Sequence, residues 1–286
     1  MTMTAYHVVQ PDQPHSAVVF ASPHSGRDYS AAFVQSSVLD EHSIRSSEDA
    51  YVDLLFDSAP QFGASFITAN APRAFVDLNR SCDELDPALI EGMKRQGHNP
   101  RVASGLGVIP RVVANGQAIY RGKMSMAQVH RRLDTYWHPY HRTLQSLLDA
   151  SHVRHGQAIL VDCHSMPHEA MDGSVRRGIP RPDVVLGDRF GAAASGQVVD
   201  RIEAALAAAG FVVARNAPFA GAYIAQSYGR PSRGQHAVQV EIDRSLYMDE
   251  KTIVPSENFE VVRKALRGVI AEIALIGQGQ IPLAAE

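Results

Sequence analysis

One eight-residue segment, 160–167, constrains the fold of this chain more than any other feature. An apolar run that begins at Ala158 ends at Val161 and leads directly into Asp162 and His164. Continuous apolar runs of this kind are typical of strands that are buried on both faces. Open α/β sheets bind their ligands outside the carboxyl ends of such strands. The segment therefore predicts a buried strand that carries an acid and a histidine to a ligand-binding edge of a sheet.

A second segment near the start of the chain repeats this design. The apolar run 17–20 leads into Ser-Pro-His-Ser-Gly at 22–26, which contains His24. Catalytic zinc usually takes three protein ligands, histidines or carboxylates, and keeps one position open. Two strands that each end in a histidine therefore predict two halves of one metal site, with His24 and His164 as ligands. The alternative is that each histidine is a hydrogen-bonded structural residue.

The third ligand of such a site should be an acid from another segment. Glu48 and Asp49 follow Ser46 and Ser47, either of which can cap a helix whose first turn would hold the two acids. Acids are favoured at a helix start without any metal, because they interact with the helix dipole. The pattern leaves both readings open.

Strand-like and helix-like segments alternate along the chain. Apolar runs predict strands at 15–21, 64–69, 157–163, 183–186, 211–215 and 237–242. Helical periodicity is present at 126–148, 198–206 and 256–276, with Pro139 expected to interrupt the first segment and Gly210 to end the second. This alternation predicts an α/β fold, a single domain over 1–286 whose central mixed, mainly parallel sheet has helices on both faces.

Composition excludes several classes of partner. The chain has 286 residues with 27 basic and 30 acidic side chains, and no sustained basic run, which argues against a nucleic-acid partner. No apolar run approaches the length of a membrane span, and residues 1–14 lack the regions of a signal peptide. With only two cysteines, the chain is expected to be cytoplasmic. The sequence leaves the oligomeric state open.

The late strand 237–242 contains an acid that suits proton transfer. Strict alternation places Gln239, Glu241 and Asp243 on one face of this strand. A carboxylate beside a zinc-bound water can take its proton and pass it to a leaving amine. Glu241 is therefore the candidate base. The alternative is a solvent-facing acid on an edge strand.

Arginines form a third group of candidate residues. Arg73, Asn79 and Arg80 lie close together after the strand at 64–69. Arginine forks bind carboxylates bidentately, so a metal with arginines predicts an amide substrate that carries free carboxylates. The alternative is that these arginines pair with neighbouring acids, for which the candidates are Asp77, Asp83 and Glu84. The loop residues Arg176, Arg177 and Arg230 are further candidates to reach the site.

Cys163 stands directly beside His164, which raises the question of a thiol nucleophile. A thiol at the end of a buried strand is more often inert. We therefore favour the metal site over nucleophilic catalysis by Cys163.

Taken in order, these segments resemble the N-formylglutamate amidohydrolase family. The resemblance rests on 22–26, 49–54, 76–80, 162–167, 186–188, 216–221 and 239–248, which extend over nearly the whole chain. The segment Asp-Leu-Asn-Arg at 77–80 also resembles the substrate-binding segment of aspartoacylases, relatives of zinc carboxypeptidases. This wider group implies a mixed-sheet α/β core of the zinc-exopeptidase or phosphorylase/hydrolase-like type, with one zinc ion per chain and a glutamate base.

The resemblance also implies a role for each candidate residue. His24 and His164 match zinc ligands, and Asp49 matches the acid ligand, with Glu48 as the alternative. Glu241 matches the catalytic base, and Arg80, with Asn79 and Arg73 beside it, matches the substrate-binding residues. The chain departs from the zinc carboxypeptidase pattern at Arg27, where that pattern has a glutamate three residues after the first histidine.

The activity implied by the resemblance is zinc-dependent hydrolysis of N-formyl-L-glutamate to formate and L-glutamate, a step of histidine degradation. One alternative is a related metal-dependent amidohydrolase or carboxypeptidase that acts on another N-acyl amino acid or a small peptide. A second alternative is a metal-free binding module for acidic small molecules. In each case the expected partner is a small carboxylate, not a nucleic acid or a membrane.

Overall fold

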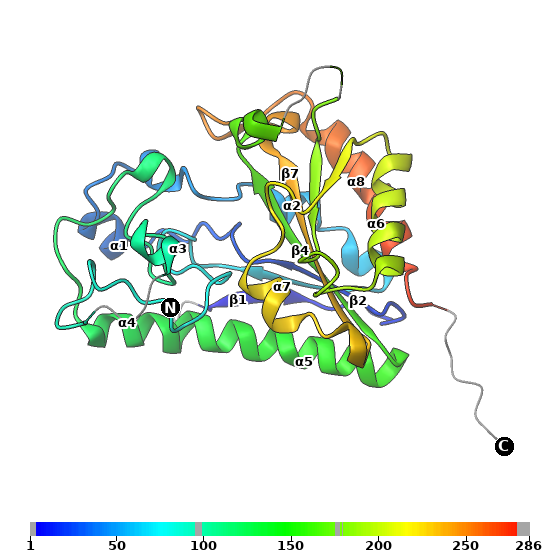
Figure 1. Cartoon of the computed structure of the whole chain (residues 1–286), viewed down its shortest axis with the longest axis horizontal. Helices are drawn as coiled ribbons and strands as arrows, with labels where there is room; N and C mark the ends of the chain where they lie inside the picture. Colours follow the sequence, from blue (N-terminus) through cyan, green and yellow to red (C-terminus); the bar gives the residue numbers. More distant parts are fainter. Residues whose placement is uncertain (1–3, 95–98, 175–177, 179, 279–286) are drawn as a thin grey trace. The chain divides into compact units, whose positions relative to one another are not determined.

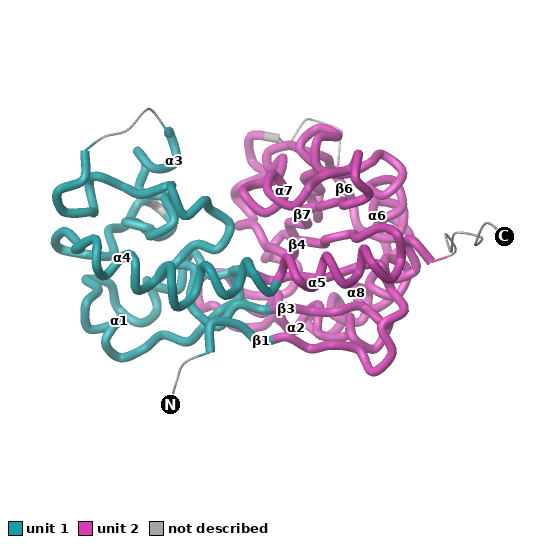
Figure 2. Tube along the Cα trace, turned by 90° about the horizontal axis from the view of Figure 1, so that it is seen from below, with its two compact units in different colours: residues 1–7, 23–50, 68–143 teal, residues 8–22, 51–67, 144–286 magenta. Residues whose placement is uncertain are grey.

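The computed structural model describes residues 4–94, 99–174, 178 and 180–278 (Figure 1). The chain divides into two compact units, shown in different colours in Figure 2. The first unit comprises 1–7, 23–50 and 68–143, and the second comprises 8–22, 51–67 and 144–286. That 1–286 acts as one domain stays a prediction.

Seven strands form one sheet, and each of them has residues in the second unit. The strands are β1 (Tyr6–Val9), β2 (Val18–Ser22), β3 (Ser65–Ala69), β4 (Ala158–Met166), β5 (Val184–Gly187), β6 (Val213–Arg215) and β7 (Gln235–Asp243). Their order in the sheet is β1-β3-β2-β4-β7-β5-β6. β4 pairs in parallel with β2 and β7, β5 pairs in parallel with β6, and β5 pairs antiparallel with β7. The predicted mixed, mainly parallel sheet is confirmed.

Each of the six predicted strands is present. Every residue of β2 and β4 is buried, as expected for the centre of a sheet covered on both faces. Three further strands, β1 and the two-residue pair β8 (Met248–Asp249) and β9 (Val254–Pro255), were not predicted from the sequence. β1 alternates between half-buried and exposed positions at the edge of the sheet, so it has no apolar run to mark it.

In the second unit, helices flank the sheet (Figure 1). The α-helices are α1 (Ala31–Ser36), α2 (Val52–Leu55), α3 (Pro100–Ala103), α4 (Met126–Arg132), α5 (His138–His155), α6 (Gly196–Ala208), α7 (Tyr223–Tyr228) and α8 (Phe259–Ala274). Short 3-10 turns are η1 (Ser43–Arg45), η2 (Ala59–Phe62), η3 (Ala114–Gly116), η5 (His168–Ser174), η6 (Pro231–Arg233) and η7 (Arg244–Leu246). In the second unit α8 packs against α2 and α6, and α7 packs on β7 and β4. The helical periodicity predicted at 256–276 corresponds to α8, whose apolar face, including Leu266 and Ile273, is buried. No helix among the described residues is long and apolar enough to cross a membrane.

Pro139 was expected to interrupt the first helical segment, and the departure from α-helical geometry lies in the turn before it. A π-helical turn, η4 (Leu133–Trp137), joins α4 to α5, and the His138 N–H bonds the Leu133 carbonyl. Because proline lacks an N–H and crowds the preceding turn, widening this turn lets the helix continue through Pro139.

The helix predicted to start at Ser46 or Ser47 is wrong. Residues 46, 47 and 50 lie in turns after η1, residues 48 and 49 have no regular structure, and α2 begins only at Val52. Tyr51 has a φ of 66°, so the backbone leaves helical geometry directly before α2. Glu48 and Asp49 therefore do not lie in the first turn of a helix.

The first unit has its own small core. Phe33, Ile44, Ala74, Val113 and Ile119 form a buried cluster, with aromatic rings packed around it. The Arg132 guanidinium carbon lies 3.9 Å from the centre of the Phe75 ring, a cation–π contact. This core supports the loops that follow β3 in the chain.

Candidate active site

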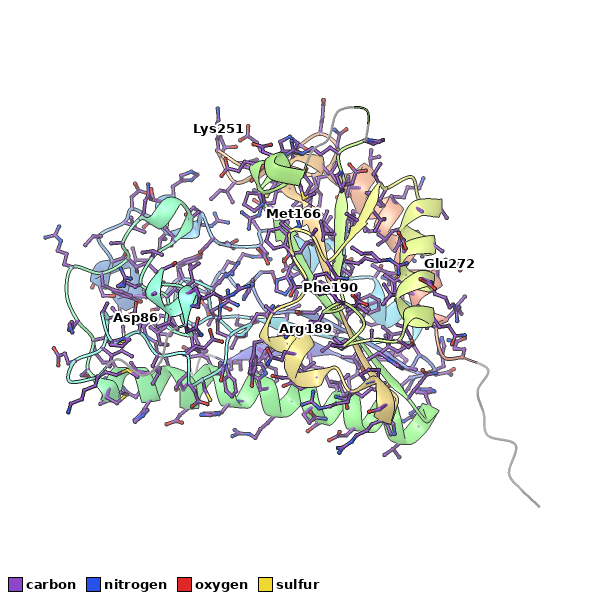
Figure 3. All side chains as sticks on the ribbon, viewed as in Figure 1. Asp86, Met166, Arg189, Phe190, Lys251 and Glu272 are labelled. Atoms are coloured by element: carbon purple, nitrogen blue, oxygen red, sulfur yellow. The ribbon has the colours of Figure 1, made fainter. Side chains whose placement is uncertain are left out.

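In the second unit, β4 and β7 place acids and a histidine side by side. His164 of β4 is the register partner of Glu241 of β7. Both residues, and those that follow them to the ends of β4 and β7, are buried. Met166, labelled in Figure 3, is the last residue of β4 and marks the carboxyl end of this strand. β7 lies between β4 and β5, so the alternative of an edge strand with a solvent-facing acid is wrong. Glu241 is only 8% exposed.

His164 is oriented by an acid on its own strand. The Asp162 Oδ2 atom lies 3.0 Å from His164 Nε2, and the Asp162 side chain is fully buried. A carboxylate beside an imidazole nitrogen favours the N–H form of that nitrogen. The other nitrogen, Nδ1, is then the one that can ligate a metal.

In the first unit, His24 has the same arrangement two residues beyond β2. Its Nε2 atom lies 2.7 Å from Asp77 Oδ1. Asp77 also accepts hydrogen bonds from Arg73 Nε and the Asn79 backbone N–H, at 3.1 and 2.8 Å. Burial acts to raise the pKa of Asp77, but His24, Arg73 and Arg80 together hold this pKa well below its usual value. Asp77 is therefore an ionised acceptor, which makes Nε2 of His24 the donor.

Glu48 and Asp49 are neighbours in sequence with different surroundings. Glu48 accepts from both Arg45 Nε and Arg45 Nη2 at 3.0 Å, and from the Tyr29 hydroxyl at 3.0 Å. Asp49 instead has its Oδ2 atom 3.5 Å from His24 Nδ1, and its backbone N–H bonds the His24 carbonyl. The carboxylate of Glu48 is thus occupied by an ion pair, and that of Asp49 lies near Nδ1 of His24, the nitrogen that Asp77 leaves available for a metal.

His24, Asp49 and His164 form a buried group that could hold a metal ion. One candidate ligand atom from each residue lies within 4.8 Å of the other two. Both histidines present Nε2 to a buried aspartate, and such carboxylate–histidine pairs are the usual support of metal-ligating imidazoles. The donor set, two imidazoles and a carboxylate, is one that zinc takes in catalytic sites. The residues present therefore fit a metal.

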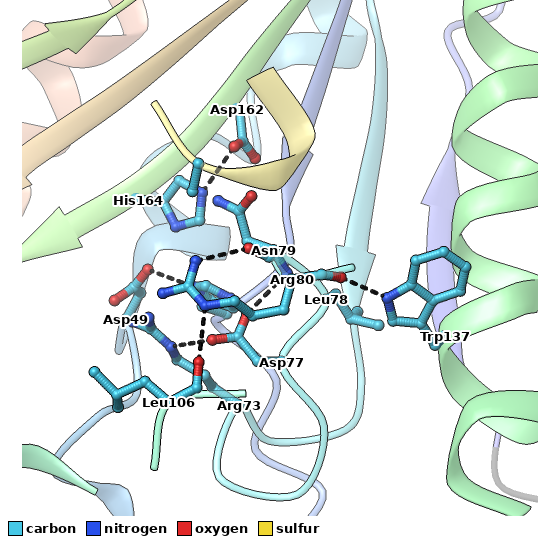
Figure 4. Close-up of polar contacts among 12 residues, drawn as sticks. Asp49, Arg73, Asp77, Leu78, Asn79, Arg80, Leu106, Trp137, Asp162 and His164 are labelled. Carbon is cyan, nitrogen blue, oxygen red and sulfur yellow. Dashed lines mark hydrogen bonds and ion pairs between the residues drawn. The ribbon is translucent and has the colours of Figure 1, made fainter. Parts of the chain in front are cut away.

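Arg80 is a buried arginine whose partners are backbone carbonyls. Its Nε donates to the Leu106 carbonyl and its Nη1 to the Asn79 carbonyl, each at 3.0 Å (Figure 4). The residue is 4% exposed, and no ion pair joins it to a carboxylate among the described residues. Burial lowers the pKa of its guanidinium from the usual value, against the opposing effect of Asp77. The alternative that the arginines pair with acids therefore describes Arg73 but not Arg80.

Two residues that sequence reasoning missed hold the loop of Asn79 and Arg80. Trp137 of the π-helical turn donates its Nε1–H to the Arg80 carbonyl at 2.9 Å, and His141 Nε2 donates to the Leu78 carbonyl at 2.9 Å. Burial lowers the pKa of His141 to about 3, so this ring is neutral. The orienting roles of Asp77 and Asp162 were also missed. Asp162 is two residues from His164, which is a common arrangement in sequence, and Asp77 is 53 residues from His24, so nothing near His24 in the sequence points to it.

The structure gives no site role to Cys163 or Arg230. Burial raises the pKa of the Cys163 thiol well above its usual value, which agrees with an inert cysteine. Arg230 Nη1 donates to the carbonyls of Gln226 and Gly229 at the end of α7. Arg176 and Arg177 lie outside the described residues.

Comparisons with known proteins give the family. The family N-formylglutamate amidohydrolase matches residues 16–248. N-formylglutamate deformylase of Pseudomonas aeruginosa is 31% identical over 264 residues, 90% of each chain, and that of Pseudomonas putida is 30% identical over 240 residues, 82% of each chain.

Solved structures agree with the family match. The crystal structure of N-formylglutamate amidohydrolase from Ralstonia eutropha JMP134 has a TM-score of 0.89 and 32% identity, and covers 96% of this chain and 98% of that one. The gene product Atu2144 of Agrobacterium tumefaciens has a TM-score of 0.62 at 15% identity over 96% of this chain and 93% of its own, which shows a shared fold. The chain therefore belongs to the N-formylglutamate amidohydrolase family and is a hydrolase that acts on an amide.

Proposed function

We propose that this chain hydrolyses N-formyl-L-glutamate to formate and L-glutamate, and that it does so with one zinc ion. The relatives named N-formylglutamate deformylase, about a third identical over most of the chain, support this substrate. The observation that carries the proposal is the buried group His24, Asp49 and His164, in the same chain as the buried Arg80.

His24, Asp49 and His164 are the residues that would hold the zinc. Zinc bound there would supply Lewis-acid chemistry: it would polarise a carbonyl oxygen and lower the pKa of water towards about 7. Asp77 and Asp162 keep the two imidazoles in the tautomer that can ligate. Glu48 is not proposed as a ligand, because Arg45 and Tyr29 already engage its carboxylate.

Glu241 is the proposed general base. Its carboxylate accepts a proton from the attacking water, whose oxygen bonds the formyl carbon. When the carbon–nitrogen bond breaks, the same proton passes from Glu241 to the departing amine, so formate and the free amino group of glutamate result. A base that acts in both steps needs a fixed position beside the metal ligands, and Glu241 is the register partner of His164.

Arg80 is the proposed binding residue for a substrate carboxylate, with Asn79 and Arg73 beside it. A guanidinium binds a carboxylate through two parallel N–H bonds. Arg80 is already held through Nε and Nη1 by backbone carbonyls, so its plane is fixed before substrate arrives. Pre-organisation of this kind reduces the entropy lost on binding.

A substrate panel tests the proposal. Purified, zinc-loaded protein should release formate from N-formyl-L-glutamate faster than the corresponding acid from N-acetyl-L-glutamate, and N-formyl-L-leucine should bind weakly because it lacks the side-chain carboxylate. A preference for an N-acetyl amino acid or a dipeptide would favour the alternative of a related amidohydrolase or carboxypeptidase.

We also propose that the protein works in histidine degradation in the cytoplasm, as one domain. The free thiols Cys82 and Cys163 are consistent with a reducing compartment. Cell fractionation with an antibody against the chain tests the location. Accumulation of N-formylglutamate on histidine medium, when the chain is deleted, tests the role.

A further inference from the structure

We infer that Gln239 is a positioning residue that holds the Glu241 carboxylate in its working orientation. The Gln239 Nε2 atom donates to Glu241 Oε1 at 2.7 Å, and both side chains are buried on the same face of β7. This inference rests on the proposed role of Glu241 as the base.

The orientation of the Gln239 amide follows from its other neighbour. The Ala222 backbone N–H lies 2.9 Å from Gln239 Oε1, and a backbone N–H can only donate. If the amide were reversed, its NH₂ group would face this N–H and its oxygen would face the Glu241 carboxylate. Both of these contacts are repulsive. Ala222 therefore determines that Gln239 presents a donor, and not an acceptor, to Glu241.

The position of Ala222 is in turn determined by two packed loops. Asn216 and Asp188 exchange two hydrogen bonds, Asn216 Nδ2 to Asp188 Oδ1 at 2.6 Å and Asp188 N to Asn216 Oδ1 at 3.1 Å. A Cβ at Gly187 would lie 2.5 Å from the Gly221 nitrogen, so the end of β5 packs directly on the residue before Ala222. Gln239 thus connects the base to backbone that cannot shift without breaking this packing.

Fixing one oxygen of Glu241 restricts the direction of the whole carboxylate. A glutamate side chain without such a partner loses rotamer freedom when it adopts the reactive geometry. This entropy loss adds to the activation barrier of the reaction. Gln239 makes that ordering part of the folded structure. Its removal should lower turnover and leave substrate binding nearly unchanged.

Two variants of Gln239 separate position from fold. Gln239→Met removes both hydrogen bonds at similar volume, and Gln239→Glu keeps an acceptor for Ala222 but loses the N–H donor. Each should lower kcat roughly 10–100-fold, the usual effect of losing an outer partner of a reactive group, with KM little changed. Gln235→Met is the matched control, because Gln235 lies on the same strand, donates to the Tyr228 carbonyl and does not contact Glu241. It should leave kcat unchanged.

A double-mutant cycle then tests whether Gln239 acts through Glu241. In a Glu241→Gln background, Gln239→Met should cause no further loss of kcat, because the group that it positions has lost its basicity. The inference would be overturned if the losses of kcat in the two single variants multiplied in the double variant. It would also be overturned if folded Gln239→Met protein had a normal kcat, or if only its KM changed. If Gln239→Met does not fold, Gln239→Glu decides by the same criteria. Near-normal turnover in Glu241→Gln alone would instead remove the proposed base, a different failure.

Discussion

At the scale of residues, Glu48 and Asp49 show how neighbours in sequence take different tasks. Asp49→Ala should abolish stoichiometric zinc, because it removes one of the three proposed ligands. Glu48→Ala should keep zinc but lower the free energy of unfolding by about 1.5–3 kcal/mol, the worth of hydrogen bonds to a charged group, because Arg45 and Tyr29 lose their shared acceptor. Zinc titration and urea denaturation of both variants decide this, and the reverse order would exchange the two assignments.

Glu241→Gln keeps the shape of the side chain and removes its basicity. Zinc and substrate should still bind, and kcat should fall roughly 10²–10⁴-fold, the usual contribution of a general base. Single-turnover kinetics with N-formyl-L-glutamate measure the chemical step directly. Turnover near that of the unmodified protein would contradict the mechanism even with the metal site intact.

Arg80→Lys keeps a positive charge but loses the planar fork. We expect KM for N-formyl-L-glutamate to rise with a smaller change in kcat, the signature of lost uniform binding. Arg230→Lys is the control, since Arg230 bonds carbonyls at the end of α7, and its KM should not move. An unchanged KM in Arg80→Lys would exclude Arg80 from carboxylate binding.

At the scale of elements, the continuous helical segment α4–η4–α5 holds the loop of Arg80 through two side-chain hydrogen bonds. Its π-helical turn ends at Trp137, and α5 carries His141 one turn later. Both side chains donate to carbonyls of the loop that holds Arg80. π-Helical turns are frequent at functional sites, and here the widened turn ends at Trp137, which donates to the Arg80 carbonyl.

His141 also gives this element a pH dependence. Its folded-state pKa, about 3, lies below the usual 6.5, so between these values the unfolded chain binds a proton that the native ring does not. The free energy of unfolding should therefore fall as the pH falls from about 6.5 to about 3, by up to about 1.4 kcal/mol per pH unit from this group. His141→Gln should reduce that slope in denaturation experiments at pH 4–6. His130→Gln, at an exposed position on α4, is the matched control.

At the scale of the whole molecule, bound zinc should stabilise the native state. A ligand that binds only the folded protein adds about 2.7 kcal/mol at a concentration of 100 Kd. Chelation should therefore lower Tm and abolish formate release, and added zinc should restore both. His24→Ala should have a Tm that does not respond to zinc. A zinc response of normal size in that variant would remove His24 from the metal site.

Local physics explains why so much of this fold could be predicted from the sequence. Buried strands need continuous apolar runs and surface helices need a 3.6-residue period, so β2, β4, β7, α6 and α8 were all visible in short windows. The two histidines were visible for the same reason, because each follows such a run. β1 was not predicted, because an edge strand whose residues alternate between half-buried and exposed positions needs no apolar run.

Tertiary structure decided which polar groups meet. Asp77 lies 53 residues from His24, and Ala222 lies 17 residues from Gln239, so neither pair falls within one strand or one turn of helix, where local sequence patterns act. Glu48 and Asp49 have the same chemistry, and only the turn before α2 directs one to Arg45 and the other to His24. The amino-acid order thus determined the elements and the kinds of residue at their ends. The partner of each buried charge was decided by packing, because a buried charge must be satisfied by whatever the fold brings within hydrogen-bond distance.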